Sequence, residues 1–290
     1  MDVVHYVNGK LVNEKETVIN IFDLGLIRAY AVFDYVRLYN GKFFHLNDHL
    51  ERLQNSAHKM KIILPISIND IHDIAHLLLE KNPQIDAGMR FIITGGLVQS
   101  DLISPSSISS LIILFHPLKS LPNYNDSNSI KVITTKLSRI FPDVKSTNYT
   151  SAILALKEAY IKNYDDALYI NDKNEILEGT TSNIFFFKNK TLITADSSDI
   201  LKGITRKVVL KLAEGNFPIE FRPLNISEIE NCEEAFLTAS NKQILSVSMI
   251  DDKIIGNGLA GENTKKLQFM FNKYLEKYFF DVKQNIKTTI

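Results

Sequence analysis

The chain has 290 residues, of which 45% are hydrophobic and 23% charged, a composition typical of a globular protein with one large domain or two ordinary ones. Lysine plus arginine equals aspartate plus glutamate, 33 of each, so net charge provides no attraction for nucleic acid or for an anionic membrane surface. Cys232 is the only cysteine, which excludes an intramolecular disulfide and a cysteine-based metal cluster, and we expect no metal site.

The beginning of the chain lacks the basic and apolar regions of a signal peptide. No uncharged apolar run approaches the roughly 20 residues that span a bilayer. Together with the single cysteine, these features indicate a protein of the reducing cytoplasm. We expect its partner to be a small, compact substrate rather than nucleic acid or a membrane.

The first part of the chain predicts strands followed by helices. The strands are rich in β-branched and aromatic residues, and the Asn-Gly pairs at 8–9 and 40–41 favour tight hairpin turns. Apolar residues at helical spacing come next. The expected elements are strands at 3–7, 17–19, 32–39, 89–94 and 111–115 and helices at 47–60 and 69–79.

Apolar periodicity stops at 117–129, where Pro, Asn, Asp and Ser dominate. We therefore expect a smaller α/β domain at 1–118, a linker at 119–129 and a larger domain at 130–290. The expected elements of the larger domain are strands at 130–135, 167–170, 183–187, 191–194, 219–222, 235–238 and 244–250 and helices at 151–161, 205–213 and 262–278. The irregular alternation of strands and helices, with many hairpins, predicts an α+β fold rather than a doubly wound parallel sheet.

Two segments carry donors suited to an anion. The stretch 202–206 opens an expected helix, where glycine, free N–H groups and the helix dipole favour negative charge. Alternatively, Gly203 simply ends a loop and Thr205 caps the helix. The stretch 238–241 follows a strand and offers hydroxyl, amide and backbone donors, although an ordinary hydrogen-bonded turn has the same composition.

Two further segments carry groups for proton chemistry. Glu178 comes at a strand end beside a hydroxyl-rich turn, where a carboxylate either holds a cationic ring nitrogen or is an ordinary solvated acid. Lys145 lies in the polar stretch 143–149. A lysine that forms imines must spend time neutral, which requires desolvation or neighbouring positive charge. A solvated loop lysine is the alternative.

Taken in order, these segments resemble the class IV aminotransferases, the fold-type IV pyridoxal-phosphate (PLP) family of branched-chain aminotransferases, D-amino acid aminotransferases and aminodeoxychorismate lyases. The resemblance covers nearly the whole chain. Its motifs lie at 6–9, 32–37, 49–53, 145–149, 178–183, 201–206 and 236–241. It implies a two-domain α+β fold whose larger domain binds PLP, amino acid and 2-oxo acid substrates, and at least a homodimer.

The resemblance also implies a role for each matching residue. Lys145 is similar to the Schiff-base lysine, whose amine moves the substrate Cα proton, and Glu178 to the acid that pairs with the pyridine nitrogen. Arg52 is similar to the arginine that holds the phosphate, a surface helix arginine being the alternative. The other implied cofactor residues are Tyr149 near the phenolic oxygen, Gly203, Ile204 and Thr205 in a phosphate cup, and Ser240 and Asn241 in a second phosphate loop.

Two arginines depart from or extend this pattern. Arg28 stands where relatives commonly have an apolar or aromatic residue, and Arg90 lies on the strand that lines the substrate pocket in relatives. Because a guanidinium grips a carboxylate through two hydrogen bonds, we expect both to bind substrate carboxylates, one of them from the other subunit of a dimer. Alternatively, Arg28 pairs with a structural acid such as Asp34. Phe33 and Tyr35 are expected to line an apolar substrate pocket.

Three functions are consistent with these residues. The leading one is a PLP-dependent aminotransferase that moves an amino group from a branched-chain or D-amino acid to a 2-oxo acid such as 2-oxoglutarate. The second is an aminodeoxychorismate lyase, which uses the same Lys145 and Glu178 to release p-aminobenzoate and pyruvate. The third is a catalytically inactive relative that acts as a binding protein. The joint presence of Lys145, Glu178 and Arg52 argues against the third.

Overall fold

The computed structural model describes residues 2–82, 86–105, 108–118 and 129–287. The chain divides into two compact units. Unit 1 is Met1–Leu121 together with Arg139–Tyr149, and unit 2 is Pro122–Ser138 together with Thr150–Ile290. Apart from Ser129, the linker expected at 119–129 lies outside the described residues. Lys145 therefore lies in unit 1, although the neighbouring stretches of chain on both sides belong to unit 2.

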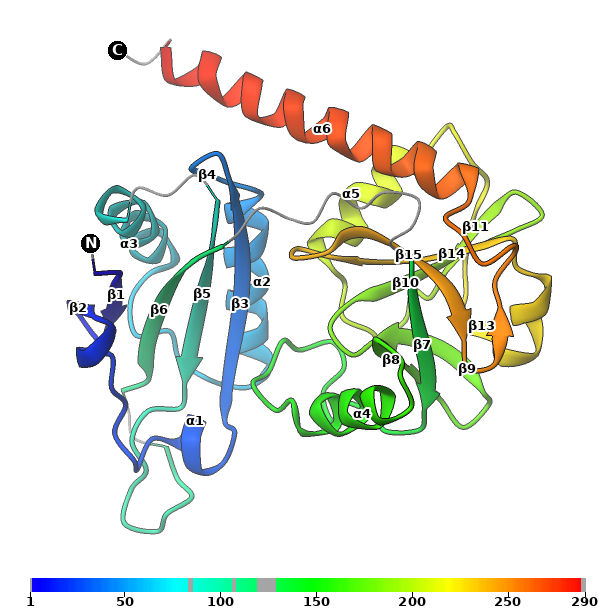
Figure 1. Cartoon of the computed structure of the whole chain (residues 1–290). Coiled ribbons are helices and arrows are strands. Elements are labelled where there is room, and N and C mark those ends of the chain that lie inside the picture. The colour runs from blue at the N-terminus through cyan, green and yellow to red at the C-terminus, as the bar shows by residue number, and fades with distance from the viewer. Residues whose placement is uncertain (1, 83–85, 106–107, 119–128, 288–290) are drawn as a thin grey trace. The chain divides into compact units, whose positions relative to one another are not determined.

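Unit 1 is a six-stranded sheet in the order β2-β1-β6-β5-β3-β4, with helices α2 and α3 packed on one face (Figure 1). Its strands are β1 (Val4–Val7), β2 (Lys10–Asn13), β3 (Ala31–Tyr39), β4 (Lys42–Phe43), β5 (Ala87–Thr94) and β6 (Ser110–Pro117). Its helices are the 3-10 helix η1 (Glu14–Glu16), α1 (Leu24–Ile27), α2 (Leu46–Lys59) and α3 (Ile68–Lys81).

Local sequence explains the hairpins of unit 1. Asn8 and Gly9 between β1 and β2, and Asn40 and Gly41 between β3 and β4, all have positive φ, as a type I′ turn requires, so both expected hairpins are confirmed. The strand expected at 17–19 is wrong. The side chain of Asn13 caps η1 there, and the chain leaves β2 through this turn without a further strand partner.

The pleat of β3 sorts its side chains onto two faces. Val32, Val36 and Leu38 point to the face covered by α2 and α3, where they are fully buried in the core of unit 1. Asp34 has the same parity and is also fully buried, so a carboxylate lies within this apolar layer. Residues of the other parity, Phe33 among them, lie on the opposite face of the sheet.

Unit 2 is a ten-stranded mixed sheet in the order β12-β11-β10-β14-β15-β7-β8-β9-β13, with β16 paired to β15. Its strands are β7 (Ile130–Thr135), β8 (Asp166–Ile170), β9 (Glu175–Gly179), β10 (Asn183–Lys188), β11 (Thr191–Thr194), β12 (Ile219–Phe221), β13 (Leu224–Asn225), β14 (Glu234–Ala239), β15 (Gln243–Ile250) and β16 (Lys253–Ile254). Its helices are α4 (Thr150–Ile161), α5 (Ile204–Ala213), the 3-10 helix η2 (Ile226–Asn231) and α6 (Glu262–Lys287).

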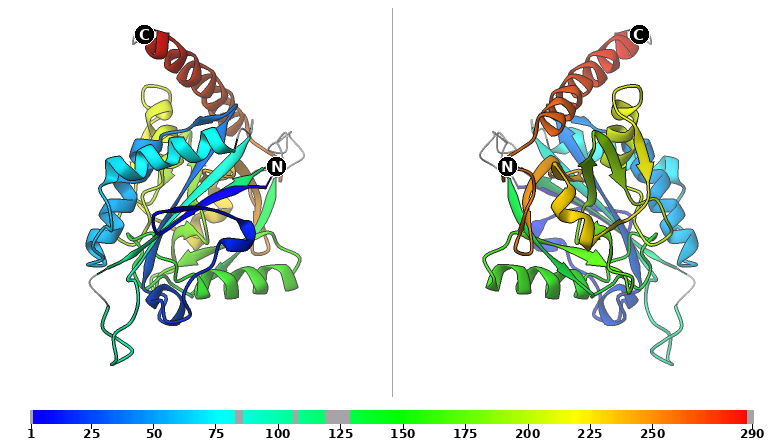
Figure 2. Two further views of the ribbon diagram at one scale, coloured as in Figure 1. Left: turned by 90° about the vertical axis from the view of Figure 1, so that its left-hand side faces the viewer. Right: turned by 90° about the vertical axis from the view of Figure 1, so that its right-hand side faces the viewer.

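The helices of unit 2 pack on different parts of the sheet, and both views in Figure 2 show α4 and α6 on opposite sides of the unit. Helix α4 lies against β7 and β8, whereas α5 and α6 pack together over β14. The α+β architecture expected from the sequence is confirmed, and α6 continues beyond the expected end at 278. Among the described residues, no helix has the length and apolar character needed to cross a bilayer.

Candidate functional site

Lys145 is held on the edge of β3. Ser146 forms a β-bridge with Val32, and the Phe33 N–H donates to the Lys145 carbonyl oxygen at 2.9 Å. The edge is available for this pairing because β4 covers only the far end of β3. On the α2 side, the Lys145 N–H donates to Ser56 Oγ at 3.3 Å. The lysine backbone is therefore fixed by β3 and α2 rather than carried on an open loop.

Several of the expected site residues of unit 1 gather around the Phe33 ring. Lys145 Nζ lies 4.8 Å from the ring centroid, and Arg90 Cζ lies 5.5 Å from it, both within the range of cation–π attraction. The Tyr149 ring meets Phe33 edge to face at 5.5 Å. Tyr35 pairs in register with Arg90 across β3 and β5. This arrangement presents two cations and three aromatic rings on one side of the sheet.

Arg28 has a different environment. It is exposed at the end of α1, and its guanidinium donates to the neighbouring Ile27 carbonyl oxygen at 3.0 Å. The expected alternative, an ion pair with Asp34, is wrong. The Asp34 carboxylate is fully buried and is instead bound by Arg52 and His49 from α2.

Arg52 is anchored by that buried carboxylate. Its Nε and Nη2 donate to Asp34 Oδ2 and Oδ1, both at 2.8 Å, and its side chain is 14% exposed. The alternative of a surface helix arginine is therefore wrong. His49, one turn earlier on α2, places Nδ1 at 2.7 Å from Asp34 Oδ1.

The titration of this cluster follows from its burial and its charges. Burial works to raise the pKa of the Asp34 carboxyl, but the charge of Arg52 and the hydrogen bonds from Arg52 and His49 outweigh it and hold that pKa well below its usual range. Burial is the main cause that lowers the pKa of His49, opposed by Asp34 and reinforced by the positive charges of Arg52 and Lys145. Asp34 is therefore ionised and His49 neutral near pH 7.

In unit 2, Glu178 lies near the end of β9 and is 4% exposed, so the alternative of a solvated turn acid is wrong. Its Oε2 accepts the Leu201 N–H at 3.0 Å. Asn183 donates from Nδ2 to the Leu201 carbonyl oxygen at 2.7 Å and lies 3.5 Å from the same Glu178 oxygen. Asn183 thus links the acid to the segment before α5. The sequence-based assignment missed it, although a polar residue opening an otherwise apolar strand was a usable signal.

The N-terminus of α5 lies beside Asn183. Gly203, not Thr205, occupies the N-cap position, so the alternative in which Thr205 caps this helix is wrong. A Cβ at Gly203 would overlap Asn183 Oδ1, which explains why glycine is needed there. Glycine has no side chain that could cap the helix. The N–H groups of Ile204 and Thr205 therefore point out of the N-terminus of α5 and receive no hydrogen bond acceptor from the N-cap residue.

The second expected phosphate loop lies at the same edge of the sheet. Thr238 of β14 pairs in register with Asn183 of β10, and Ser240 and Asn241 form the turn into β15. The Thr238 hydroxyl is buried, and no hydrogen-bond partner for it exists among the described residues. An unsatisfied buried hydroxyl is costly, and a polar ligand at this edge would give it a partner.

The chain has relatives along nearly its whole length. The family model described as amino-transferase class IV matches residues 31–250. A Methanocaldococcus jannaschii protein, provisionally named a branched-chain-amino-acid aminotransferase, is 34% identical over 281 residues, which cover 94% of this chain and 96% of the relative. D-alanine aminotransferase of Staphylococcus haemolyticus is 26% identical and covers 93% of this chain and 97% of its own.

The fold is similar to that of solved branched-chain aminotransferases. The branched-chain aminotransferase of the archaeon Thermoproteus uzoniensis, solved with norvaline, superimposes with a TM-score of 0.85 at 24% identity over 94% of both chains. The family match extends over most of the chain, and the resemblance inferred from the seven motifs is confirmed. The chain belongs to the class IV aminotransferases, a family of PLP-dependent transaminases.

Proposed function

We propose that this aminotransferase uses PLP to move amino groups from branched-chain or D-amino acids to a 2-oxo acid such as 2-oxoglutarate. The relatives support this range, because they are named as branched-chain and D-alanine aminotransferases. The observation that carries the cofactor assignment is the setting of Lys145, whose backbone is fixed by β3 and whose amine lies against the Phe33 ring. The lyase alternative gains no support from these relatives.

The residues of each unit fit the chemistry of PLP. A phosphate needs cations and N–H or O–H donors, and unit 2 offers the N-terminus of α5 and the partnerless Thr238 hydroxyl. Ser240 and Asn241 extend this set of donors. In unit 1, Arg52 offers a guanidinium whose orientation is set by Asp34. Gly203, Ile204 and Thr205 would hold the phosphate through their backbone.

The remaining side chains would supply proton transfer and positioning. When bound, PLP supplies an electron sink for the negative charge that develops at the substrate Cα. The buried Glu178 carboxylate would keep a proton on the pyridine nitrogen, and Tyr149 would lie near the phenolic oxygen. The Lys145 amine would remove the Cα proton from the substrate and deliver it to C4′ of the cofactor. The Phe33 ring would limit the access of water to that amine.

Substrate recognition is assigned to the opposite face of β3 and β5 from α2. Arg90 is exposed there, beside Phe33 and Tyr35, so a substrate carboxylate would meet a guanidinium next to an apolar wall. Arg28 would bind a second carboxylate. Because its described contacts include no acid, its charge is available to an anionic ligand.

A homodimer is part of the proposal. Unit 1 exposes several large apolar side chains on the segment that carries Arg28, and this segment is tied to Leu97 by a β-bridge from Asp23. The exposed members are Val18, Ile19, Ile21, Phe22, Leu26 and Leu97. Such a cluster is typical of a protein interface. Sedimentation velocity should give a dimer that Phe22→Glu dissociates, and a monomeric wild type would contradict this.

The buried thiol of Cys232 agrees with a reducing compartment such as the cytoplasm.

The deciding experiment uses purified protein and free PLP. Wild type should gain the visible absorbance of bound cofactor, and Lys145→Ala should lose the covalent part of it while keeping its fold by circular dichroism. Adding D- and L-amino acids separately, with 2-oxoglutarate, should give transamination with one series. Release of pyruvate from aminodeoxychorismate alone would replace this function by the lyase, and absence of PLP uptake by the wild type would remove the proposal.

A further inference from the structure

The buried carboxylate of Asp34 is a costly feature that the proton chemistry of the proposed reaction does not use. A lone ionised carboxylate in an apolar core is strongly unfavourable unless its oxygens are hydrogen-bonded and its charge is paired. Here Oδ1 accepts the Tyr35 N–H at 2.7 Å in addition to its bonds with His49 and Arg52. One of these bonds comes from the backbone of β3, and the others come from side chains of α2. The carboxylate therefore orients the side chains of that helix.

The two bonds from Arg52 fix the rotation of its guanidinium. They use Nε and one N–H of Nη2, which form one edge of the planar group, called here its inner edge. The outer edge, with the two N–H groups of Nη1 and the second of Nη2, consequently points away from Asp34. A planar group held along one edge presents the other in a fixed direction, which suits bidentate recognition of an anion.

His49 constrains the same carboxylate from a second direction. Asp34 is ionised and His49 neutral, so the short contact between them requires the tautomer with the proton on Nδ1, which donates to Oδ1. The imidazole is 1% exposed and comes from the helix face that also carries Arg52. The ring therefore prevents the carboxylate from turning away from Arg52.

We propose that Asp34 and His49 are positioning residues that hold the outer edge of Arg52 in its anion-binding direction before the anion arrives. The inference rests on the proposed function in one respect, namely that the anion is the phosphate of PLP. Preorganisation of this kind increases affinity because the guanidinium does not have to be ordered during binding. It acts on the phosphate alone and leaves the contacts of the pyridine ring unchanged.

The test compares PLP with pyridoxal, which lacks the phosphate, by fluorescence titration of the cofactor-free full chain. The ratio of the two dissociation constants reports the contribution of the phosphate. His49→Gln keeps a polar side chain but moves its donor to the position of Nε2, so the PLP affinity should fall roughly ten-fold while that of pyridoxal is unchanged. His49→Asn places its amide donor near Nδ1 and should restore most of the ratio.

Further variants complete the test. Arg52→Lys keeps the charge but lacks the guanidinium edge that pairs with Asp34. Its preference for PLP over pyridoxal should therefore fall at least as much as that of His49→Gln. If His49→Gln fails to fold, Asp34→Asn decides the inference, because it removes the negative charge that orients Arg52 while leaving the guanidinium in place, and it should lower the ratio of the two affinities. His58→Gln, on the exposed side of α2, is the matched control and should leave the ratio unchanged.

The outcomes separate the two proposals. A wild type that takes up neither PLP nor pyridoxal contradicts the proposed function. A wild type that prefers PLP, with His49→Gln and Arg52→Lys retaining its ratio within about two-fold, overturns the positioning role alone. A general loss of affinity for both ligands in His49→Gln, with no rescue in His49→Asn, would indicate a merely structural histidine and also overturns it.

Discussion

The Tyr35 hydroxyl occupies the space directly over the Cα atom of Gly88, so that a Cβ on residue 88 would overlap the phenol ring and its oxygen. The two residues lie diagonally across β3 and β5, since Gly88 pairs in register with Arg37 and Tyr35 with Arg90. The missing side chain of residue 88 therefore determines where the phenol lies on the face assigned to the substrate.

Gly88→Ala should displace Tyr35 and lower the free energy of unfolding by about 1–3 kcal/mol, the usual cost of overpacking. It should also raise the KM for the amino acid substrate, because Tyr35 is assigned to the pocket wall. Chemical denaturation and steady-state kinetics measure the two effects. In the Tyr35→Ala background the same glycine change should cost much less, and equal costs in both backgrounds would show that the overlap is relieved elsewhere.

Arg90→Ala should raise the KM for 2-oxoglutarate roughly ten- to hundred-fold, because it removes the proposed hydrogen-bonded ion pair with a substrate carboxylate. The KM for a 2-oxo acid with an apolar side chain should change less if Arg90 binds the distal carboxylate. Steady-state kinetics with both acceptors measures this difference. Arg28→Ala is analysed in the same way, and an unchanged KM for every oxo acid would remove that residue from the site.

Asn183→Asp should lower kcat roughly ten- to hundred-fold at saturating PLP. The change removes the donor to the Leu201 carbonyl oxygen and places a like charge near Glu178, which disfavours the ionised form of the acid that is proposed to keep the pyridine nitrogen protonated. The pH dependence of the bound cofactor's absorbance should shift with it. Asn257→Asp, in an exposed turn, is the control, and equal kcat values for both variants would contradict the role of Asn183.

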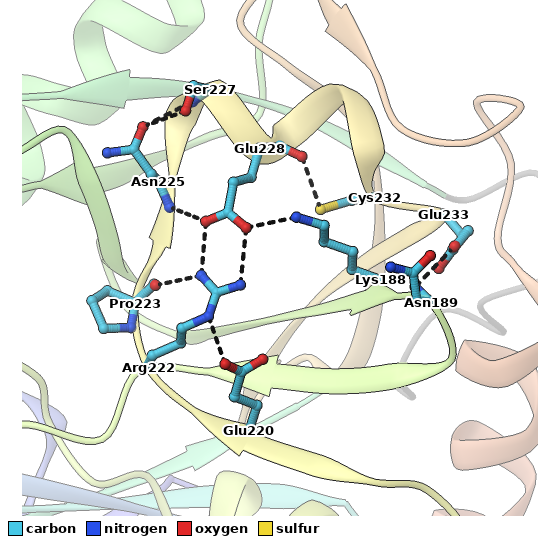
Figure 3. A network of polar contacts seen from close by, with 10 residues as sticks. All are labelled: Lys188, Asn189, Glu220, Arg222, Pro223, Asn225, Ser227, Glu228, Cys232 and Glu233. Atoms are coloured by element: carbon cyan, nitrogen blue, oxygen red, sulfur yellow. Dashed lines mark hydrogen bonds and ion pairs between the residues drawn. The ribbon is translucent and has the colours of Figure 1, made fainter.

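An ion network around η2 should make the stability of the protein depend on pH in the acid range (Figure 3). Arg222 donates to both oxygens of Glu228, at 2.7 and 2.9 Å, and Lys188 donates to Oε2 at 2.7 Å. The hydrogen bonds from Arg222 are the largest cause that lowers the pKa of Glu228, to about 2, with burial opposing and Lys188 assisting. The unfolded chain then binds the proton first, so this stability is full above about pH 4.5 and is lost as pH falls toward 2.

Glu228→Gln should therefore lower the free energy of unfolding at pH 7 by about 1–3 kcal/mol, discounted for partial exposure of the pair. Its stability should also decline less than that of the wild type between pH 4.5 and 2. Urea denaturation across this range measures both quantities. Glu230→Gln, on the same 3-10 helix but 68% exposed, should behave like the wild type. Parallel pH profiles for the wild type and Glu228→Gln would contradict the assignment.

Cys232 should be inert toward Ellman's reagent in the folded protein. Burial raises the pKa of its thiol to about 12, so almost none of the reactive thiolate is present near pH 8. In denaturant the same reagent should detect one thiol per chain, which is the full cysteine content. Rapid reaction under native conditions would show that the region around η2 opens locally.

Much of the fold could be predicted because its signals are local. Asn-Gly pairs adopt positive φ without help from distant residues, so both hairpins of unit 1 were predictable. The strand expected at 17–19 failed because β propensity does not reveal whether a partner strand is present. The alternative that Thr205 caps α5 failed for a related reason, since the glycine at position 203 is required by Asn183, a residue of β10.

The sequence by itself determined the α+β class, most of the helices and strands, and the family, because these depend on periodicity and on short motifs in a fixed order. Only the tertiary structure decided how deeply each charged group is buried and which partner it binds. From the sequence, a surface helix position remained an alternative for Arg52, and an ion pair with Arg28 remained an alternative for Asp34. The folded chain places α2 over the buried face of β3, and because an ionised carboxylate there requires nearby donors, Asp34 is bound to Arg52 and His49.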